Sequence, residues 1–478
     1  MFSSLRREQK EAIGLLQVGT FLEYFDLMLY VHMAVLLNDL FFPKTDPHTA
    51  ALLTAFAFCS TYVLRPFGAL LFGYIGDHIG RKTTVVMTTT MMALSCLMMA
   101  NLPTYSQIGI AASWIVTGCR IVQGLSSMGE VIGAEIYLAE LIKVPERYFA
   151  VAMISLSTAL GPAFALGIAS LVTTKGFNWR LAFWIGACIA FVGAMARTRL
   201  RETPEFADMK RRMKRTLKDE DPHNTGKVAE LLKSTNPIWK EKANKKTLLA
   251  SFLVQSGWPV FFYFVYIYCG NVLKTKFGYT PEQIIHQNFY VSLVQVSTVI
   301  LSLILVMKTY PLTILKTKFC IISCMVFFLP FLLERASSPN EVFFLQAFCI
   351  FFALSPVPAS PILFIYLPIL KRFTCDSFVY ACSRALIYFI TAFGLVYLTE
   401  PFGHFGLWFI MIPACIGYIW GVQYFDKLER ERNDYHPANR ASAEFALKRL
   451  QEEMAASRYN RLQEGAKYYP TQEKTFHP

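Results

Sequence analysis

The sequence is poor in charged residues and lacks any recognisable catalytic constellation. Asp, Glu, Lys and Arg make up 17% of the 478 residues, and apolar residues make up 54%. An ordinary soluble domain has about 25% charged residues. There is no H-E-x-x-H pattern and no G-x-S-x-G pattern, since G-L-S-S-M-G does not have that spacing. We therefore expect neither an enzyme nor a metal site.

Cysteine pairs and a secretory leader are absent as well. The eleven cysteines are scattered, mostly in apolar stretches, with no C-x-x-C pair and no histidine at a metal-binding spacing. We expect them to act as small hydrophobic residues inside helices. The N-terminal stretch MFSSLRREQKEA is polar and is not followed by a short apolar region with a cleavage site, so a cleavable signal is not expected.

Long apolar runs, by contrast, are abundant. Many reach the roughly 20 residues that a helix needs to cross a bilayer, and in lipid such a run must be helical to satisfy its backbone polar groups. The sequence predicts an all-α integral membrane protein with twelve transmembrane helices in two six-helix bundles. These helices are expected at residues 12–36, 49–72, 83–102, 107–138, 149–173, 180–197, 247–273, 287–307, 319–333, 341–366, 378–398 and 404–425.

A long polar stretch divides the membrane part in two. We predict an N-terminal bundle over residues 1–198, a cytoplasmic linker over 199–246, a C-terminal bundle over 247–426 and a cytoplasmic tail over 427–478. Lys and Arg are concentrated at both termini, in the linker and in the loops on the same side, which makes that side cytoplasmic. This asymmetry accounts for much of the net charge of +13. The basic run KRRMKR in the linker is interpreted as a solvated loop near anionic lipid and not as a nucleic-acid site.

The most informative short pattern is GYIGDHIGRK, which begins at Gly73. Its spacing, G-x-x-x-D-x-x-G-R-K, predicts a tight loop between the second and third helices that holds a carboxylate and cations at fixed places. Gly73, Gly76 and Gly80 allow helices and backbone to approach closely. Asp77 is expected either to pair with Arg81 or to lie at a helix N-terminus.

This pattern resembles the signature loop of major facilitator superfamily transporters. Other stretches resemble the metabolite:proton symporter branch of that superfamily, which includes proline/betaine transporters. They are GTFLEYFDLMLY in the first helix, YVLRPFGALLF in the second, RIVQGLSSMGEVIGAEIYLAE in the fourth and RETPEF after the sixth. The resemblance covers most of residues 12–206 and implies the major facilitator fold, with alternating access between two bundles. It also implies a cytoplasmic gate formed by Gly73, Asp77, Gly80, Arg81 and Lys82.

The C-terminal half resembles the family only in helix count and hydropathy. The counterpart of the signature loop between the eighth and ninth helices, MKTYPLTILKTK, keeps cations but lacks the Gly-x-x-x-Asp spacing. Between the tenth and eleventh helices the stretch LKRFTCDSF has Asp376 near the place where the branch has an arginine. One half of the gate is therefore expected to be altered.

Ionisable residues inside the expected spans are candidates for proton coupling. An ionisable group at membrane depth costs at least ~2.5 kcal/mol unless it faces a cavity or a partner. Two stripes of such residues, each about 60–80° wide on its helix, are expected to face inward. They consist of Glu23, Asp26 and Tyr30 in the first helix and Arg120, Gln123, Ser127 and Glu130 in the fourth. We predict that Asp26 and Glu130 bind the proton, with Glu23 as a third candidate and Glu135, off the stripe, ranked lower. The alternative is a buried charge network that only fixes helix packing.

Substrate-binding residues are predicted on the first, fourth, seventh and eleventh helices. Aromatic faces on the seventh helix can hold an ammonium group by cation–π attraction, and Arg120 is expected to modulate the carboxylates or to bind the carboxylate of the same zwitterion. Arg384, flanked by Tyr380 and Tyr388 at helical spacing, is a second anion contact. The predicted set is Tyr30, Arg120, Gln123, Gln255, Trp258, Tyr266 and Arg384, with Phe262 on the same aromatic stripe. The alternative is that the aromatic stripe packs in the core or faces lipid.

Together these features predict a proton-coupled symporter that imports a small polar metabolite, most simply a zwitterion such as proline or a betaine-type osmolyte. The expected partners are this small molecule, protons and the lipid bilayer, without nucleic acid. We expect a monomer in the cell (inner) membrane, driven by the proton gradient without a cofactor. The alternatives are a di- or tricarboxylate symporter that uses Arg65, Arg120 and Arg384, and a sensor that binds a solute without moving it. Antiport is indicated only by the pair Gly161-Pro162, a fragment of a G-x-x-x-G-P motif.

Overall fold

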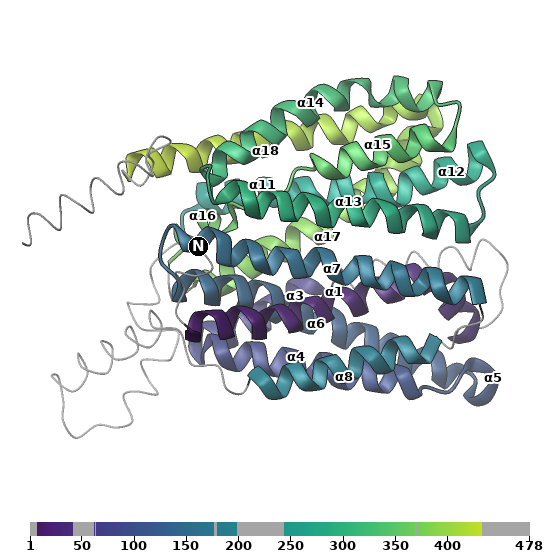
Figure 1. The fold of residues 1–478 in the computed structure, drawn as a ribbon, viewed down its shortest axis with the longest axis horizontal. Coiled ribbons are helices and arrows are strands. Elements are labelled where there is room, and N and C mark those ends of the chain that lie inside the picture. The colour runs from purple at the N-terminus through teal and green to yellow at the C-terminus, as the bar shows by residue number, and fades with distance from the viewer. Residues whose placement is uncertain are drawn as a thin grey trace, which may run out of the picture. The chain divides into compact units, whose positions relative to one another are not determined.

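The structure is a computed structural model that describes residues 7–41, 62, 64–175, 179–197, 243–368 and 371–432. By internal packing the chain divides into two units, Met1–Asp426 and Lys427–Pro478. The following description concerns the first unit. All of its regular elements in the described residues are helices (Figure 1).

The N-terminal half contains the helices drawn from purple to blue in Figure 1. They are α1 (Arg7–Phe41), α3 (Arg65–His78), α4 (Arg81–Asn101), the single turn α5 (Tyr105–Ile108), α6 (Ile110–Leu141), α7 (Glu146–Lys175) and α8 (Trp179–Arg197). Gly80 separates α3 from α4 with a φ of 150°, a backbone conformation that side chains with a Cβ rarely adopt. The glycine of the signature pattern is therefore required by this turn.

The C-terminal half contains the helices drawn from teal to yellow. They are α11 (Lys245–Tyr263), the π-helical turn η3 (Phe264–Tyr268), α12 (Cys269–Phe277), α13 (Pro281–Val306), α14 (Pro311–Arg335), α15 (Pro339–Phe351), α16 (Ser360–Ile365), α17 (Arg372–Phe402), the 3₁₀ turn η4 (Gly403–Leu407) and α18 (Trp408–Glu431). Several of these helices begin with proline in the first turn, where a missing N–H leaves no hydrogen bond unmade.

Several predicted helices are wrong in extent. The second, expected to end at residue 72, continues as α3 to His78, so Gly73, Gly76 and Asp77 are helical and not in a loop. The ninth, expected over 319–333, is longer: α14 begins at Pro311, so Lys316 and Lys318 are helical and not loop cations. The tenth, expected as one helix over 341–366, is broken, because α15 ends at Phe351 and helix resumes only at Ser360. The intervening prolines have no N–H to donate, which stops the helix.

Seven of the described helical stretches are long and apolar enough to cross a membrane. They cover Lys82–Asn101, Glu146–Leu171, Lys245–Phe277, Glu282–Val306, Pro311–Arg335, Arg372–Thr399 and Gly403–Glu431. These seven stretches fit the predicted all-helical membrane protein. The number of twelve spans, the division into bundles and the cytoplasmic side of the termini stay predictions.

The two halves meet mainly along two pairs of helices, with a smaller contact between α6 and α17. In the N-terminal half α1 packs on α7, and α4 lies against α6 and α8; in the C-terminal half α11 packs on α17. Across the halves α3 packs on α17 and α7 packs on α13, as the side-by-side ribbons of α7 and α13 show in Figure 1. The residues described next lie on these four helices, on α1, α6, α11, α14 and α16, and in the segments next to α3 and α15.

Candidate functional site: a gate contact and a central cavity

Asp77 of the signature pattern caps a helix that belongs to the other half. Its Oδ1 accepts a hydrogen bond from the backbone N–H of Phe373 at 3.3 Å, and its Oδ2 accepts from the backbone N–H of Thr374 at 2.9 Å and from Thr374 Oγ1 at 2.7 Å. These are the second and third residues of α17, whose first N–H groups have no partner inside their own helix. A carboxylate here is also favoured by the positive end of the helix dipole. Asp77 is 1% exposed, so the contact is shielded from solvent.

The glycines of the signature pattern allow this contact by their size. A Cβ on Gly73 would lie 2.7 Å from the Cα of Thr374, and a Cβ on Gly76 would lie 3.0 Å from the ring of Phe373. Side chains at either position would hold α3 away from α17. Lys82 lies in the first turn of α4 and is partly exposed. The side chain of Arg81 lies outside the described part of the structure, so pairing between Asp77 and Arg81 stays a prediction.

A buried ion pair lies beside this contact of Asp77 with α17, which is called below the gate contact because the sequence predicts a gate here. Arg372 Nη1 donates to Glu140 Oε1 at 3.2 Å, and the exposed fractions of the two side chains are 8% and 0%. Glu140 lies near the end of α6 and Arg372 is the first residue of α17. The charge at the beginning of α17 is therefore this arginine, and Asp376 is turned into the cavity described below. Asp376 thus lines the cavity, and the expectation that one half of the gate is altered stays a prediction.

The halves also meet at the opposite end of the helices. Ser170 Oγ and His286 Nδ1 lie 2.7 Å apart, joining the last turns of α7 to the first turns of α13. Because α7 begins close to Glu140 and rises ~1.5 Å per residue, Ser170 is far from Asp77. The two ends are called below the Asp77 end and the His286 end.

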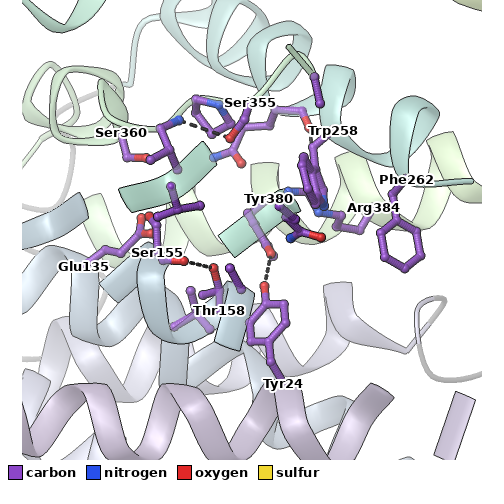
Figure 2. Close-up of a pocket in the computed structure, with 18 of the residues that line it drawn as sticks. Tyr24, Glu135, Ser155, Thr158, Trp258, Phe262, Ser355, Ser360, Tyr380 and Arg384 are labelled. Carbon is purple, nitrogen blue, oxygen red and sulfur yellow. Dashed lines mark hydrogen bonds between the residues drawn. The ribbon is translucent and has the colours of Figure 1, made fainter. Parts of the chain in front are cut away.

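Between the two ends lies a cavity of about 120 Å³, here called the central cavity. A single water needs roughly 10–15 Å³ in the same measure, so the space suits a small metabolite. Its polar and aromatic lining comes from both halves: Tyr24, Tyr62, Arg65, Glu135, Ser155, Thr158, Gln255, Trp258, Phe262, Gln295, Thr298, Ser302, Lys318, Ser355, Ser360, Asp376, Tyr380, Arg384 and Tyr388. Figure 2 shows several of these side chains around the cavity.

Arg384 is held in place by a helix defect in α11. Pro259 lies inside α11 and has no N–H to donate to the carbonyl of Gln255, four residues earlier. Arg384 Nη1 donates to that carbonyl at 2.6 Å. Its guanidinium carbon also lies 4.4 Å from the ring centre of Tyr380, whose hydroxyl is 2.7 Å from the hydroxyl of Tyr24 (Figure 2). The predicted anion contact thus lines the cavity with its orientation fixed by two neighbours.

Arg65, which the sequence analysis named only for the di- or tricarboxylate alternative, is a second cation in the cavity wall. It is 1% exposed, and its guanidinium carbon lies 4.6 Å from the ring centre of Tyr62. The Tyr62 ring contacts the ring of Tyr388 from the other half, with centres 4.5 Å apart. Within the described residues, Arg65 Nε and Nη2 have no hydrogen-bond partner. A buried cation with free donors facing a cavity is suited to an anionic group.

The predicted aromatic stripe is only partly in the cavity. Gln255, Trp258 and Phe262 line it, and Phe262 contacts Tyr388 with ring centres 5.9 Å apart. Tyr266 does not line it: its ring packs 5.0 Å from that of Phe262, and its hydroxyl donates to Gln295 Oε1 at 2.9 Å. Tyr266 therefore supports the wall from behind.

Two charged residues that line the cavity, Glu135 and Lys318, were given other places by the sequence analysis. Glu135 was ranked low because it lies off the stripe defined by Glu130, although it is the lining carboxylate on α6. Lys318 was counted as a loop residue, but it lines the cavity and donates to Ser302 Oγ at 3.2 Å. Pro311, a typical first residue of a helix, is the signal that would have placed Lys318 inside one.

Among the described residues no cluster of His, Cys, Asp or Glu could hold a metal ion.

Other predicted residues lie away from the cavity or outside the described side chains. Arg120 Nη1 donates to Gln123 Oε1 at 2.8 Å, and this buried pair does not line the cavity. Glu23 is 1% exposed and also does not line it. The side chains of Asp26, Tyr30 and Glu130 lie outside the described residues, so their roles stay predictions.

The fold and site define a helical membrane protein with a solute-sized cavity between two halves that contact each other at both ends. A model of the Major Facilitator Superfamily matches residues 16–366. The chain belongs to the major facilitator superfamily, as the signature loop predicted.

Similarity to individual proteins is more limited. The chain is 30% identical over 204 residues to a proline/betaine transporter of Salmonella typhimurium, covering 41% of each protein. It is 32% identical over 200 residues to an ectoine/proline transporter of Corynebacterium glutamicum, covering 40% of each. The match thus spans about two fifths of these relatives. Among solved structures, the proton:xylose symporter XylE, known from E. coli, superposes with a TM-score of 0.67 at 15% identity, covering 88% of this chain and 95% of that one, which shows the shared fold.

Proposed function

We propose that this protein is a secondary transporter that imports a small zwitterion, such as proline or a betaine-type osmolyte, together with a proton. The observation that carries the proposal is the lining of the central cavity. Arg384, fixed between the Gln255 carbonyl and the Tyr380 ring, faces the cavity from the same half as Trp258 and Phe262. A cation for a carboxylate and aromatic faces for an ammonium are what a zwitterion requires.

The proposal includes alternating access between the two halves. The contacts at the Asp77 end and at the His286 end support it, because each joins one half to the other and opening either would admit solute from one side only. We assign the Asp77 end to the cytoplasm from the distribution of Lys and Arg. The chain would lie in the inner membrane, act as a monomer and use the proton gradient in place of a cofactor.

Uptake into proteoliposomes tests the proposal. Labelled proline, glycine betaine and 2-oxoglutarate are offered separately, each with and without an inwardly directed proton gradient. We expect accumulation of a zwitterion that is stimulated by the gradient and abolished by a protonophore. Gradient-independent equilibration of every solute would contradict proton coupling.

A di- or tricarboxylate is the second candidate substrate, and one observation favours it. Three cations, Arg65, Lys318 and Arg384, line the cavity, against the two carboxylates Glu135 and Asp376. If one carboxylate were protonated, the excess of positive charge would suit a substrate with more than one negative charge. Preferential, gradient-driven uptake of 2-oxoglutarate in the same assay would select this candidate.

A solute sensor is the third candidate. Its support was the divergent gate sequence of the C-terminal half, and the close contact of Asp77 with α17 weakens that argument. Saturable solute binding without accumulation of any solute would favour the sensor.

A further inference from the structure

Two carboxylates line the central cavity from opposite halves, Glu135 on α6 and Asp376 on α17. Asp376 is 1% exposed, and its Oδ1 has no hydrogen-bond partner among the described residues. The segments that carry the two residues are packed together: Gly133 of α6 lies so close to Phe373 of α17 that a Cβ added to the glycine would be 3.2 Å from the Phe373 ring. Glu135 interacts electrostatically with Asp376 and with Arg384.

Among the described residues, no salt bridge joins a cation to Glu135 or Asp376. Arg384 lies nearby, but its guanidinium is bound to the Gln255 carbonyl and stacked on Tyr380. Arg372, closer to the beginning of α17, is paired with Glu140. The other titratable or charged residues that line the cavity are Tyr24 of α1, Tyr62, Arg65 of α3, Lys318 of α14, and Tyr380 and Tyr388 of α17. The lining residues from α7, α11, α13 and α16 are uncharged.

We propose that Glu135 and Asp376 together bind one proton in each transport cycle and are the coupling site of this protein. The proposal rests on the proposed function, since it assigns the proton of that symport to particular residues. In the loaded state one of the two is a neutral carboxylic acid and the other a carboxylate, so the pair carries a single negative charge.

The position of the pair explains how proton binding follows the movement of the halves. With α6 packed on α17, two carboxylates that line the same cavity, one of them 1% exposed, repel, which favours binding of one proton. When the halves separate at the Asp77 end, α6 and α17 move apart and water enters. Both changes weaken the repulsion and favour the ionised forms, so the proton leaves on that side.

The experiment compares gradient-driven uptake with solute counterflow, which needs no net proton movement. For Glu135→Gln and Asp376→Asn we expect driven uptake to fall at least about tenfold more than counterflow. Solute addition to weakly buffered wild-type proteoliposomes should alkalinise the medium, and this signal should be lost in both variants. Glu282→Gln, at an exposed carboxylate in the first turn of α13, is the matched control and should match wild type.

Conservative variants keep the proposal testable if the amide variants misfold. If the amide variants do not yield folded protein, Glu135→Asp and Asp376→Glu keep a carboxyl group and should keep driven uptake with a shifted dependence on pH. Unchanged driven uptake in Glu135→Gln and Asp376→Asn would overturn the proposal. Loss of driven uptake in Asp26→Asn or Glu130→Gln, with both cavity variants still driven, would also overturn it and return the proton to the residues predicted from sequence. If wild type shows no gradient-driven uptake of any solute, the proposed function itself fails.

Discussion

At the scale of single residues, Pro259 shows how a defect in one helix becomes a binding feature of another. The carbonyl that it leaves without an intrahelical donor accepts from Arg384 of α17. Hydrogen bonds that involve a charged group contribute about 1.5–3 kcal/mol each. The proline thus orients the cation that we assign to the substrate carboxylate.

Pro259→Ala should therefore weaken substrate binding without lowering stability. The alanine N–H competes with Arg384 for the Gln255 carbonyl, while removal of an interior proline favours the helix. We expect KM to rise by about tenfold, as loss of one such bond implies, with an unchanged or higher melting temperature in detergent. Pro330→Ala in α14, a buried proline that does not line the cavity, should leave KM unchanged. An unchanged KM in Pro259→Ala would show that Arg384 does not depend on this carbonyl.

Asp77→Asn should loosen the gate contact. The amide keeps one acceptor but loses the charge that favours the N-terminus of α17, so we expect roughly a tenfold shift toward opening at the Asp77 end. Cys375, half-buried next to Thr374, is a native probe, and its labelling rate by a thiol reagent, read by mass spectrometry, should rise.

Two comparisons make this labelling test specific. Cys269 is fully buried in the C-terminal half and should label equally slowly in wild type and variant. Glu11→Gln removes an exposed carboxylate from α1 and should not change Cys375 labelling. Equal Cys375 labelling in Asp77→Asn and wild type would mean that the cap does not hold the halves together.

At the scale of helices, close approach of α3 to α17 depends on the absence of side chains. Gly73→Ala places a methyl group 2.7 Å from a backbone atom of Thr374, which cannot rotate away. Overpacking of this kind costs about 1–3 kcal/mol, so we expect a lower melting temperature and reduced uptake. In Gly118→Ala, on α6, the new methyl meets nothing within 4 Å and should leave stability unchanged or higher. Equal melting temperatures for the two variants would contradict the tight packing.

The helices and the signature motif could be predicted from the sequence better than the lining of the cavity. Apolar runs predicted most helices because lipid leaves a long apolar segment no other regular structure. The break between α15 and α16 was missed because hydropathy does not register that Pro356 and Pro358 lack N–H groups. Glu135 was ranked below Glu130 because a helical wheel gives the angles between residues of one helix but does not show which side of that helix faces the cavity. Asp77 lies at a helix N-terminus, one of the two places expected from the sequence. That this helix is α17 of the other half could not be predicted, because two of the three donors are backbone N–H groups, which every helix start offers.

At the scale of the whole molecule, the contacts at the Asp77 end and those at the His286 end should be released alternately. A short bifunctional thiol cross-linker between Ser170→Cys and His286→Cys would keep the His286 end closed. We expect uptake to fall to the background of empty liposomes and to recover when the cross-link is reduced. Wild type treated with the same reagent, with its own cysteines, is the control. Full uptake in the cross-linked variant would show that the His286 end does not open during transport.

The cap on α17 also has a consequence for how substrate preference can change. Asp376, Tyr380, Arg384 and Tyr388 follow one another at every fourth residue of α17, and all four line the cavity. A small turn of this helix about its axis, permitted by an altered cap at Asp77, would reposition all of them together. Selection for a new cargo should therefore recover mutations at the Asp77 end as well as mutations inside the cavity, and a library confined to cavity residues would miss the former.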